Sequence, residues 1–377
     1  MVKLIVSGGG TGGHVYPALA AVQSLIRQCA EARIPLEMLW VGSLGGMEQG
    51  LVERAGLKIE LIPATGVRGK NPLAIVGSIW SLGRGYRRSQ EIIRQFQPDL
   101  LFITGGYVCV PVTLAARQAR IPVVIYLPDI EPGLAIKFLA RFADKVAITT
   151  AETARFFKPG LTVVTGYPVR MELLSAAADE ANKDAARRQL GLTNEWPVLL
   201  VFGGSRGARS INRAVTDELE AYLKVCQVIH ISGELDAGWV QARRAELPPE
   251  LQARYQVSAY LHEEMITALL VADLVVSRAG ASILGEYPLL GLPSILAPYP
   301  YAGTHQALNA AYLARQQAAV VINDADLNRD LKGAVIGLIT DEKKLQTMRQ
   351  ACKNLAKPDA AGRLARELLE VGLHGRN

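Results

Sequence analysis

The sequence lacks the features that mark secreted, metal-binding or membrane-spanning proteins. Its four cysteines lie far apart, with no CxxC pair, as expected of reduced thiols in a cytosolic protein. No apolar run approaches the roughly 20 residues that cross a bilayer, and the first residues resemble a strand rather than a signal peptide. No DxD-type pair or His/Cys cluster has metal-ligand spacing, so no metal or other cofactor is expected.

The charge balance is also modest. The net charge of +6 is scattered along 377 residues, and no nucleic-acid motif is present, so no nucleic-acid partner is expected. A mildly basic chain remains compatible with an anionic substrate or an anionic membrane surface. At roughly 100–200 residues per domain, the length favours two domains.

Short apolar, β-branched runs alternate with helical patterns along the whole chain. Strands are predicted at 3–7, 37–41, 59–62, 100–103, 122–126, 145–148 and 162–165, and then at 198–202, 226–231, 255–260, 273–277, 294–297 and 319–322. Helices are predicted among them, for example at 17–28, 48–55, 87–96, 175–190, 212–223, 305–316 and 360–371. This alternation predicts an α/β protein built from βαβ units with parallel sheets.

A glycine-rich loop follows the first predicted strand. Residues 8–14 read Gly-Gly-Gly-Thr-Gly-Gly-His, and a helical stretch follows them. Glycines let a phosphate or a sugar approach the backbone, and the N-terminus of the next helix favours an anion. The loop ends at His14, which titrates near neutral pH, or else acts as a core or capping residue.

The same arrangement occurs a second time, about 195 residues later. The predicted strand 198–202 leads into Gly203-Gly204-Ser205-Arg206-Gly207 and a helix. Two such starts predict two Rossmann-like domains with parallel sheets facing across a cleft, at 1–165 and 166–359. Thr165–Arg170 is the predicted crossing point, and the C-terminal helix, about 360–377, is expected to pack back on the first domain.

A dinucleotide-binding site is the obvious competitor, because Gly8, Gly10 and Gly13 match GxGxxG. That site needs an acidic residue near the end of the second strand to hold a ribose. Here the strand ends at Ser43, and Glu37 stands at its start, which is the wrong end. The fingerprint therefore lacks its partner.

Other polar residues follow later strands. Glu286 is placed one to two turns into a helix, where its carboxylate is suited to two ribose hydroxyls or is merely a solvated charge. Gln306 lies at a helix start and is suited to a sugar hydroxyl, while Thr304 is a candidate N-cap. Arg170 and Arg206 are suited to a diphosphate, or are ordinary surface arginines.

Two stretches combine apolar residues with flanking Lys and Arg. They are 72–86, with Trp80, and 134–145, with Leu134 and Phe138. Such a pattern is compatible with an anionic bilayer surface, and equally with an ordinary helix buried on one face.

Four motifs in order resemble the MurG family of glycosyltransferases. They are Gly9–Ala20, Tyr167-Pro168-Val169-Arg170, Gly203–Ala208 and His305–Ala310. The resemblance covers nearly the whole chain and implies a GT-B fold. It also implies transfer of N-acetylglucosamine (GlcNAc) from UDP-GlcNAc to lipid I, undecaprenyl-pyrophosphoryl-MurNAc-pentapeptide, to form lipid II in peptidoglycan synthesis. It further implies peripheral attachment to the cytoplasmic face of the cell membrane.

The resemblance implies a role for each matching residue. Thr11, Gly12 and Gly13 would face the diphosphate and the acceptor, and His14 would be the general base.

The donor would be held mainly by later residues. Arg170 and Ser205 would contact the UDP diphosphate, Leu261 would lie against uracil, Glu286 would hold the ribose and Gln306 would bind GlcNAc hydroxyls.

One segment departs from the family pattern. Where the family has His-Glu-Gln-Asn, this chain reads Tyr126-Leu127-Pro128-Asp129, so Asp129 becomes a second candidate base and a substrate contact, with Glu131 nearby. The family's Gly-Asn-Pro-Val-Arg also becomes Gly-Tyr-Pro-Val-Arg, with Tyr167. A related enzyme with a UDP-sugar donor and another lipid acceptor is therefore the alternative, and a UDP-sugar-binding protein without activity is the non-enzyme alternative.

Overall fold

The structure is a computed structural model. It describes residues 1–10, 12–65, 72–179, 181–204, 207–262, 264–301 and 304–374, with the side chains of 72–76, 79 and 374 left aside. The chain forms two compact units, one made of Met1–Arg170 and Pro358–Asn377 and the other of Met171–Lys357. Among the described residues, no helix is long and apolar enough to cross a membrane.

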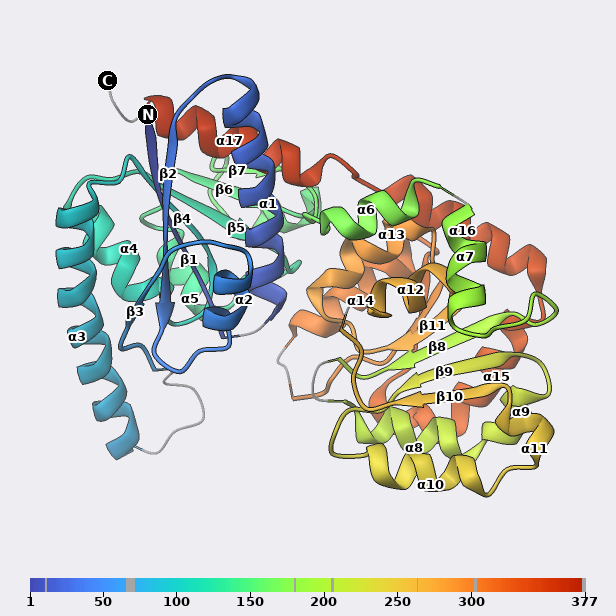
Figure 1. The fold of residues 1–377 in the computed structure, drawn as a ribbon. Helices are drawn as coiled ribbons and strands as arrows, with labels where there is room; N and C mark the ends of the chain where they lie inside the picture. The colour runs from blue at the N-terminus through green and yellow to red at the C-terminus, as the bar shows by residue number, and fades with distance from the viewer. Residues whose placement is uncertain are drawn as a thin grey trace. The chain divides into compact units, whose positions relative to one another are not determined.

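The first unit contains a seven-stranded parallel sheet (Figure 1). Its order across the sheet is β3 (Ile59–Ile62), β2 (Leu36–Ser43), β1 (Val2–Gly8), β4 (Leu100–Gly105), β5 (Val123–Leu127), β6 (Lys145–Ile148) and β7 (Thr162–Val164). In the central register, Leu4 lies between Met38 and Leu100. Strands β2 and β3 lie on one side of β1, and β4 to β7 lie on the other, so the order of successive strands reverses between β1 and β4. Open α/β sheets bind their ligands at such a switch point.

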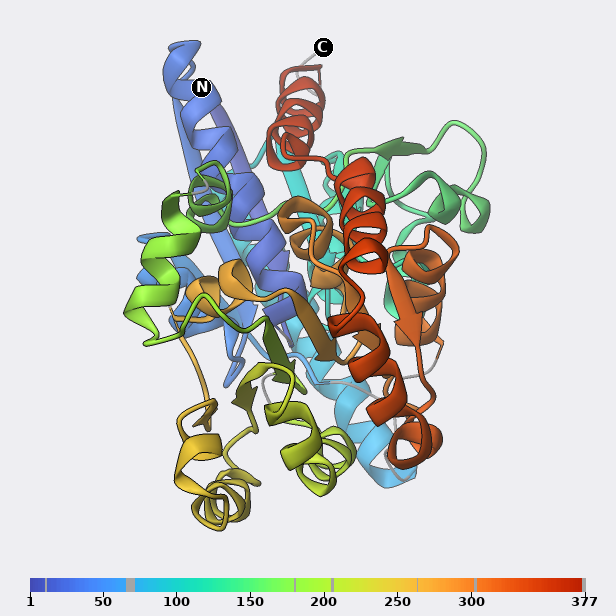
Figure 2. The ribbon, with the colours of Figure 1, turned by 90° about the vertical axis from the view of Figure 1, so that its right-hand side faces the viewer.

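Helices cover both faces of this sheet. They are α1 (Gly12–Glu31), α2 (Glu48–Arg54), α3 (Pro72–Phe96), α4 (Cys109–Gln118), α5 (Leu134–Leu139), the short 3-10 helix η1 (Ala151–Phe156) and α17 (Ala360–His374). Successive β1 side chains enter different cores: Leu4 and Val6 pack with α1 and α17, and Ile5 packs with α3 and α4. The C-terminal helix α17, red in Figures 1 and 2, thus belongs to the first unit.

The second unit contains a six-stranded parallel sheet with the same kind of strand order. Its order is β10 (Tyr255–Ser258), β9 (Gln227–Ile231), β8 (Val198–Phe202), β11 (Leu274–Ser277), β12 (Ser294–Leu296) and β13 (Ala319–Val321). The central strands β8 and β11 are buried over nearly their whole length, and they read as nearly continuous apolar runs in the sequence. The predicted α/β class with two parallel sheets is confirmed.

The helices of the second unit also lie on both faces of its sheet, with α8 and α10 below it and α12 and α13 above it in Figure 1. They are α6 (Met171–Ala177), α7 (Ala181–Gln189), α8 (Arg209–Asp217), α9 (Leu219–Leu223), α10 (Ala237–Ala245), α11 (Pro249–Gln252), α12 (Glu264–Val271), η2 (Ala281–Leu284), α13 (Glu286–Leu290), α14 (His305–Arg315), η3 (Asp324–Asp326), α15 (Leu327–Ile339) and α16 (Glu342–Leu355).

Two predicted helices are each divided in the structure. The predicted helix 212–223 is α8 and α9, separated at Glu218, and the Thr216 hydroxyl donates to the carbonyls of Asn212 and Arg213 just before the break. Such back-bonding competes with the helical hydrogen bonds and bends helices. The predicted helix 175–190 is likewise wrong as one element, because α6 ends at Ala177 and α7 begins at Ala181.

Candidate active site

The first glycine loop joins β1 to α1 at the carboxyl edge of the sheet. β1 ends at Gly8 and α1 begins at Gly12, so the turn is short, and Gly10 has a positive φ of 85°. An added Cβ at Gly10 would meet nothing within 4 Å. Gly10 is therefore the open point of the loop, where a ligand can approach the backbone. Thr11, the predicted contact, lies outside the described residues, and Gly13 lies in the first turn of α1.

Several glycines of this region serve the packing of the protein itself. A Cβ on Gly8 would collide with the Thr104 hydroxyl, and a Cβ on Gly106 would lie 2.6 Å from the Gly9 carbonyl oxygen. The two strand ends thus lie closer together than side chains would permit. The sequence predicts a glycine loop whose backbone is open to a ligand. In the structure, Gly10 is open, whereas Gly8 and Gly9 are closely packed by the protein itself.

His14 is held by the end of β4. Its Nδ1 lies 2.9 Å from the Thr104 carbonyl oxygen, and the Thr104 hydroxyl donates to the His14 carbonyl at 2.9 Å. Since a carbonyl only accepts, Nδ1 carries the proton, and the neutral ring then has its lone pair on Nε2. This tautomer has the chemistry of a general base.

A carboxylate that the sequence reasoning missed lies beneath the loop. Glu48, the first residue of α2, is completely buried and accepts hydrogen bonds from Ser43 and from the Gly10 N–H. It stands just after the end of β2, where a dinucleotide site would place its ribose acid. Because it is turned inward, it is not exposed to a ribose. In the sequence this acid stands at position 48, five residues beyond the end of the predicted second strand at Ser43.

The segment that departs from the family pattern is anchored by a buried tyrosine. The Tyr126 hydroxyl lies 3.0 Å from Thr149 Oγ1 and 3.3 Å from the Gly166 carbonyl, and burial raises its pKa well above the usual value. Asp129 follows the end of β5, and Glu131 pairs with Lys137 at 2.8 Å; both carboxylates are partly exposed. Of these two carboxylates, Asp129 is closer to the strand end, where open α/β sheets place their ligands.

Arg170 stands at the end of the first unit. Its guanidinium lies 5.2 Å from the ring centroid of Tyr16, on α1, and that ring in turn lies against Gly12. The arrangement brings the predicted diphosphate residue Arg170 to the start of α1, next to the glycine loop.

The second glycine loop joins β8 to α8. Gly204 and Gly207 have positive φ values of 89° and 72°, and a Cβ on Gly207 would collide with the Ser232 carbonyl at the end of β9. The predicted residues Ser205 and Arg206 lie outside the described part of the chain.

A buried polar network supports this loop and was not predicted. Asn212 donates to Asp236 and to the Ser232 carbonyl, both at 2.8 Å, and Arg209 donates to Asp236 at 2.7 and 2.8 Å. Because its amide nitrogen is committed to these acceptors, Asn212 presents its oxygen to His230 Nε2 at 3.0 Å. Nδ1 of His230 then accepts from the Tyr255 hydroxyl at 2.7 Å. Burial lowers the pKa of His230 to about 3, so this histidine is neutral.

The remaining predicted residues, Leu261, Glu286 and Gln306, follow β10, β11 and β12 in the chain. The Gln306 side-chain oxygen accepts from the backbone N–H of Tyr299 at 2.8 Å and of Ala279 at 3.3 Å. Glu286 begins α13 and Leu261 follows β10, and both are partly exposed. Gln306 thus links the segments that follow β11 and β12. These two hydrogen bonds fix the orientation of its side-chain amide, including the N–H groups.

A second ion network lies beside these residues. Arg278 donates to Asp324 at 2.5 Å and to Ser210 at 2.8 Å, and its guanidinium lies 5.4 Å from the ring centroid of Tyr299. Ser210 also donates to Asp324 at 2.6 Å. The first turn of α8 is therefore tied to the segments that follow β11 and β13.

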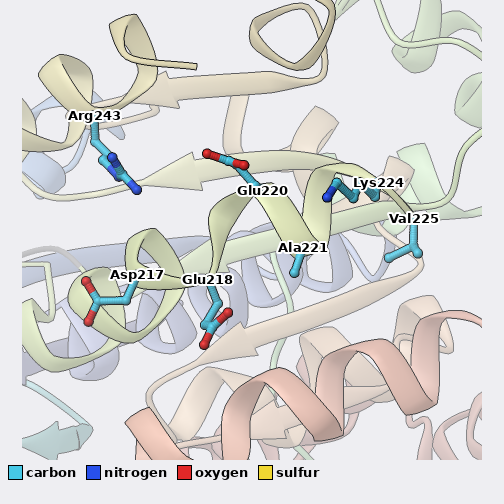
Figure 3. Close-up of a pocket in the computed structure, with 7 residues that line it drawn as sticks. All are labelled: Asp217, Glu218, Glu220, Ala221, Lys224, Val225 and Arg243. Atoms are coloured by element: carbon cyan, nitrogen blue, oxygen red, sulfur yellow. The ribbon is translucent and has the colours of Figure 1, made fainter. Parts of the chain in front are cut away.

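A separate pocket, shown in Figure 3, is lined by charged residues of α8, α9 and α10. It includes Glu218, Lys224 and Arg243, near the C-terminal ends of these helices, so it lies at the edge of the sheet opposite the glycine loops. Glu218 pairs with Lys332 and Arg243 pairs with Glu246. Within the described ranges, no group of three His, Cys, Asp or Glu side chains is arranged to hold a metal ion.

Comparison with known proteins places the chain in a family. The models of the glycosyltransferase family 28 N-terminal and C-terminal domains match residues 4–148 and 198–364. A protein of Roseiflexus sp. (strain RS-1), named UDP-N-acetylglucosamine--N-acetylmuramyl-(pentapeptide) pyrophosphoryl-undecaprenol N-acetylglucosamine transferase, is 42% identical over 95% of this chain and 92% of its own length. A protein of the same name from Listeria monocytogenes serovar 1/2a is 38% identical over 98% of this chain and 99% of its own.

Solved structures agree with this assignment. The crystal structure of Acinetobacter baumannii MurG has a TM-score of 0.75 and 25% identity, and covers 98% of this chain and 100% of that one. The chain belongs to the MurG family. The predicted GT-B fold class is confirmed, and the chain is a glycosyltransferase. A UDP-GlcNAc 2-epimerase from Neisseria meningitidis, solved with UDP-GlcNAc, shares the fold with a TM-score of 0.69 and 12% identity over 98% of this chain and 100% of its own.

Proposed function

We propose that the chain transfers GlcNAc from UDP-GlcNAc to lipid I and so forms lipid II. The observation that carries this proposal is the similarity to MurG proteins over nearly the whole chain, which includes both glycine loops. The reaction is a single displacement with inversion. The C4 hydroxyl oxygen of the acceptor MurNAc bonds to the anomeric carbon of GlcNAc, the bond from that carbon to UDP breaks, and UDP leaves with the electron pair.

His14 is the proposed base that takes the proton of the acceptor hydroxyl. The geometry that supports this role is the Thr104 carbonyl at Nδ1, which leaves the ring lone pair on Nε2. Asp129 is the second candidate, because it is a carboxylate near the end of β5, the region where the family has an amide. Thr11, Gly12 and Gly13 are proposed to face the diphosphate and the acceptor at the start of α1.

The donor is proposed to bind mainly to the second unit, corresponding to the predicted domain 166–359, and the acceptor to domain 1–165. Arg170 and Ser205 would contact the diphosphate, Leu261 the uracil and Glu286 the ribose. Gln306 would donate its N–H groups to GlcNAc hydroxyls, because its oxygen already accepts two backbone hydrogen bonds. The start of α8 and Arg170 would stabilise the charge that develops on the leaving UDP.

The polyprenyl-linked acceptor implies that the protein works at a membrane surface, and we propose peripheral attachment at its cytoplasmic face. Three large apolar side chains of the first unit support this: Trp80 is 67% exposed, Leu134 77% and Phe138 40%. The guanidinium of Arg84 lies over the Trp80 ring, and Lys137 stands next to Phe138 on α5. Exposed apolar groups flanked by basic residues suit an anionic bilayer surface.

The deciding experiment measures UDP release from UDP-GlcNAc with lipid I and, separately, with a diacylglycerol. We expect UDP release when lipid I is the acceptor and none when the diacylglycerol is the acceptor. Release with only the diacylglycerol would replace the peptidoglycan assignment by a related lipid glycosyltransferase. Tight binding of UDP-GlcNAc with no release on either acceptor would indicate a protein without transferase activity.

A further inference from the structure

The carboxylate of Glu48 is buried directly beneath the first glycine loop. Its side chain has no exposed surface, and its Oε1 accepts from the Ser43 N–H at 2.7 Å and from the Ser43 hydroxyl at 2.5 Å. Oε2 accepts from the Gly10 N–H at 3.3 Å. Hydrogen bonds to an ionised acceptor are stronger than those between neutral groups. One buried side chain thus joins the end of β2 to the turn between β1 and α1.

The same carboxylate explains why Gly9 is a glycine. A Cβ at Gly9 would lie 2.6 Å from the carboxyl carbon of Glu48, and its three nearest atoms would all belong to Glu48. The backbone of Gly9 does not have a positive φ, so an L side chain is not opposed by its dihedral angles. The absence of a side chain at this position therefore provides room for the carboxylate.

The contact continues from Gly9 to the base. The Gly9 N–H donates to the Gly105 carbonyl at 3.1 Å, and Gly106 packs against the Gly9 backbone. A Cβ at Gly105 would lie 2.7 Å from both Cε1 and Nδ1 of the His14 ring. The path from Glu48 to His14 therefore runs through two backbone turns that are in direct contact.

The loop amide at Gly10 has an unusual acceptor. In glycine loops at helix N-termini, such N–H groups ordinarily point at a bound anion. Here the protein supplies the anion itself, so the amide is fixed before any substrate binds. Such preorganisation matters because a displacement of about 1 Å in an active site lowers rates by roughly 100-fold.

We propose that Glu48 is a positioning residue for the acceptor side of the reaction. Its buried carboxylate fixes Gly9 and Gly10 and, through the turn at Gly105–Gly106, the ring of His14. This deepens the proposed function and rests on it, since His14 faces the acceptor hydroxyl there.

The first test replaces Glu48 by glutamine, which keeps the shape and removes one acceptor. If the glutamine oxygen accepts the hydrogen bonds from Ser43, the glutamine amide nitrogen faces the Gly10 N–H. Both of these groups are donors, so the hydrogen bond to Gly10 is lost. We expect hydrogen exchange of the Gly10 amide to accelerate by about tenfold, as for a lost hydrogen bond. The amide and ring signals of His14 should shift. These measurements need no substrate.

The second test is kinetic. In Glu48→Gln, kcat with lipid I should fall by about tenfold or more, while KM for UDP-GlcNAc stays within about twofold. A general loss of stability would not produce this split. Glu53→Gln is the matched control, because Glu53 lies on the same helix, is exposed and accepts a hydrogen bond from Gln49 on its own helix. It should leave both constants and the Gly10 exchange rate unchanged.

A double-variant cycle tests the packing directly. Gly9→Ala should lower Tm in the wild-type background, because the new methyl group meets the carboxylate. In a Glu48→Ala background the space is open, and Gly9→Ala should add little further loss. Equal losses in the two backgrounds would overturn the assignment of Gly9 to Glu48.

The outcomes separate this inference from the proposed function. A wild-type protein that releases no UDP with lipid I defeats the proposed function, whereas unchanged Gly10 exchange in Glu48→Gln defeats the positioning role. Altered exchange with an unchanged kcat, in a wild type that is active, also overturns the positioning role. Altered exchange together with a lower kcat and a constant donor KM supports it.

Discussion

Thr104 and His14 hold each other at two points, although 90 residues separate them in the chain. The Thr104 hydroxyl donates to the His14 carbonyl, and His14 Nδ1 lies on the Thr104 carbonyl, both at 2.9 Å. The parallel pairing of β1 with β4 makes this possible, because it brings the ends of both strands to one edge of the sheet. The orientation of the proposed base therefore depends on the strand pairing at the centre of the first unit.

Thr104→Val should disturb this base while leaving the fold intact. The variant keeps the shape but loses the hydroxyl donor, so we expect a loss of about 1 kcal/mol in the free energy of unfolding and a Tm lower by roughly 2–4 °C. UDP release should fall several-fold. Thr104→Ser, which keeps the donor, is the control and should retain both properties. Equal behaviour of the two variants would show that the hydroxyl has no role.

His14→Ala should lower kcat by about 100- to 10,000-fold, the usual contribution of a general base. The dissociation constant of UDP should change by less than about twofold, because the donor is proposed to bind to the other unit. Asp129→Asn, tested in the same assay, restores the amide that the family has at this position and should keep most of the activity. Full turnover in His14→Ala together with a large loss in Asp129→Asn would transfer the role of base to Asp129.

Buried His230 should make the second unit sensitive to acid. Its pKa is about 3 in the folded chain against an ordinary 6.5, mainly because of burial. Between these values the unfolded chain binds one more proton, so the free energy of unfolding falls as pH falls from about 6.5 towards 3. The loss approaches about 1.4 kcal/mol per pH unit below pH 6.5 and totals about 2 kcal/mol between pH 7.5 and 5.

Urea unfolding of the full chain between pH 7.5 and 5 measures this loss. Unfolding is followed by the fluorescence of Trp196 and Trp239 in a background where Trp40 and Trp80 of the first unit are replaced by phenylalanine. His230→Gln should have a lower free energy of unfolding than the wild type at pH 7.5. Its free energy of unfolding should, however, fall less steeply as the pH is lowered to 5. His262→Gln alters an exposed histidine of the same unit and should keep the wild-type slope. If His230→Gln also keeps that slope, another group is responsible for the acid sensitivity.

Asp273 should be important for the stability of the second unit. Its carboxylate accepts from the Val198 N–H at 3.0 Å and pairs with Lys183, Arg187 and Arg349 at 3.2, 3.6 and 3.0 Å. Asp273→Asn would leave three cations without their common anion, so we expect a loss of about 3 kcal/mol in the free energy of unfolding. Asp330→Asn removes an exposed partner of Arg329 and should not change Tm measurably. Equal Tm values for both variants would contradict a stabilising role for this cluster.

The strands were predictable because their signal is local. β8 is a continuous run of buried apolar residues over Val198–Phe202, and the predicted strand has the same limits. Helix ends were less predictable: α1 was expected to begin at about Pro17, but it begins at Gly12. The break between α8 and α9 at Glu218 likewise contains neither glycine nor proline, so the sequence carries no stop signal there.

The sequence points to candidate site residues only where a motif contains them. His14 ends a glycine loop, and that loop makes it a candidate base. Glu48 and Thr104 were not identified, because their roles depend on contacts with Gly9 and His14 that sheet pairing creates. The hydrogen bond between Asn212 and His230 is a similar case. In the sequence, Asn212 is an ordinary residue of a predicted helix and His230 of a predicted strand, and nothing shows that the two are in contact.

Leu134 provides the last test, which concerns the membrane. Its side chain is 77% exposed at the start of α5, so Leu134→Asp should not affect the fold. If Leu134 enters an anionic bilayer, the variant should bind vesicles of phosphatidylglycerol about tenfold more weakly in a sedimentation assay, because burial of a leucine is worth about 1.5 kcal/mol or more. Leu235→Asp is the matched control, since Leu235 is 82% exposed and belongs to the second unit. Equal binding of both variants and the wild type would remove Leu134 from the proposed membrane surface.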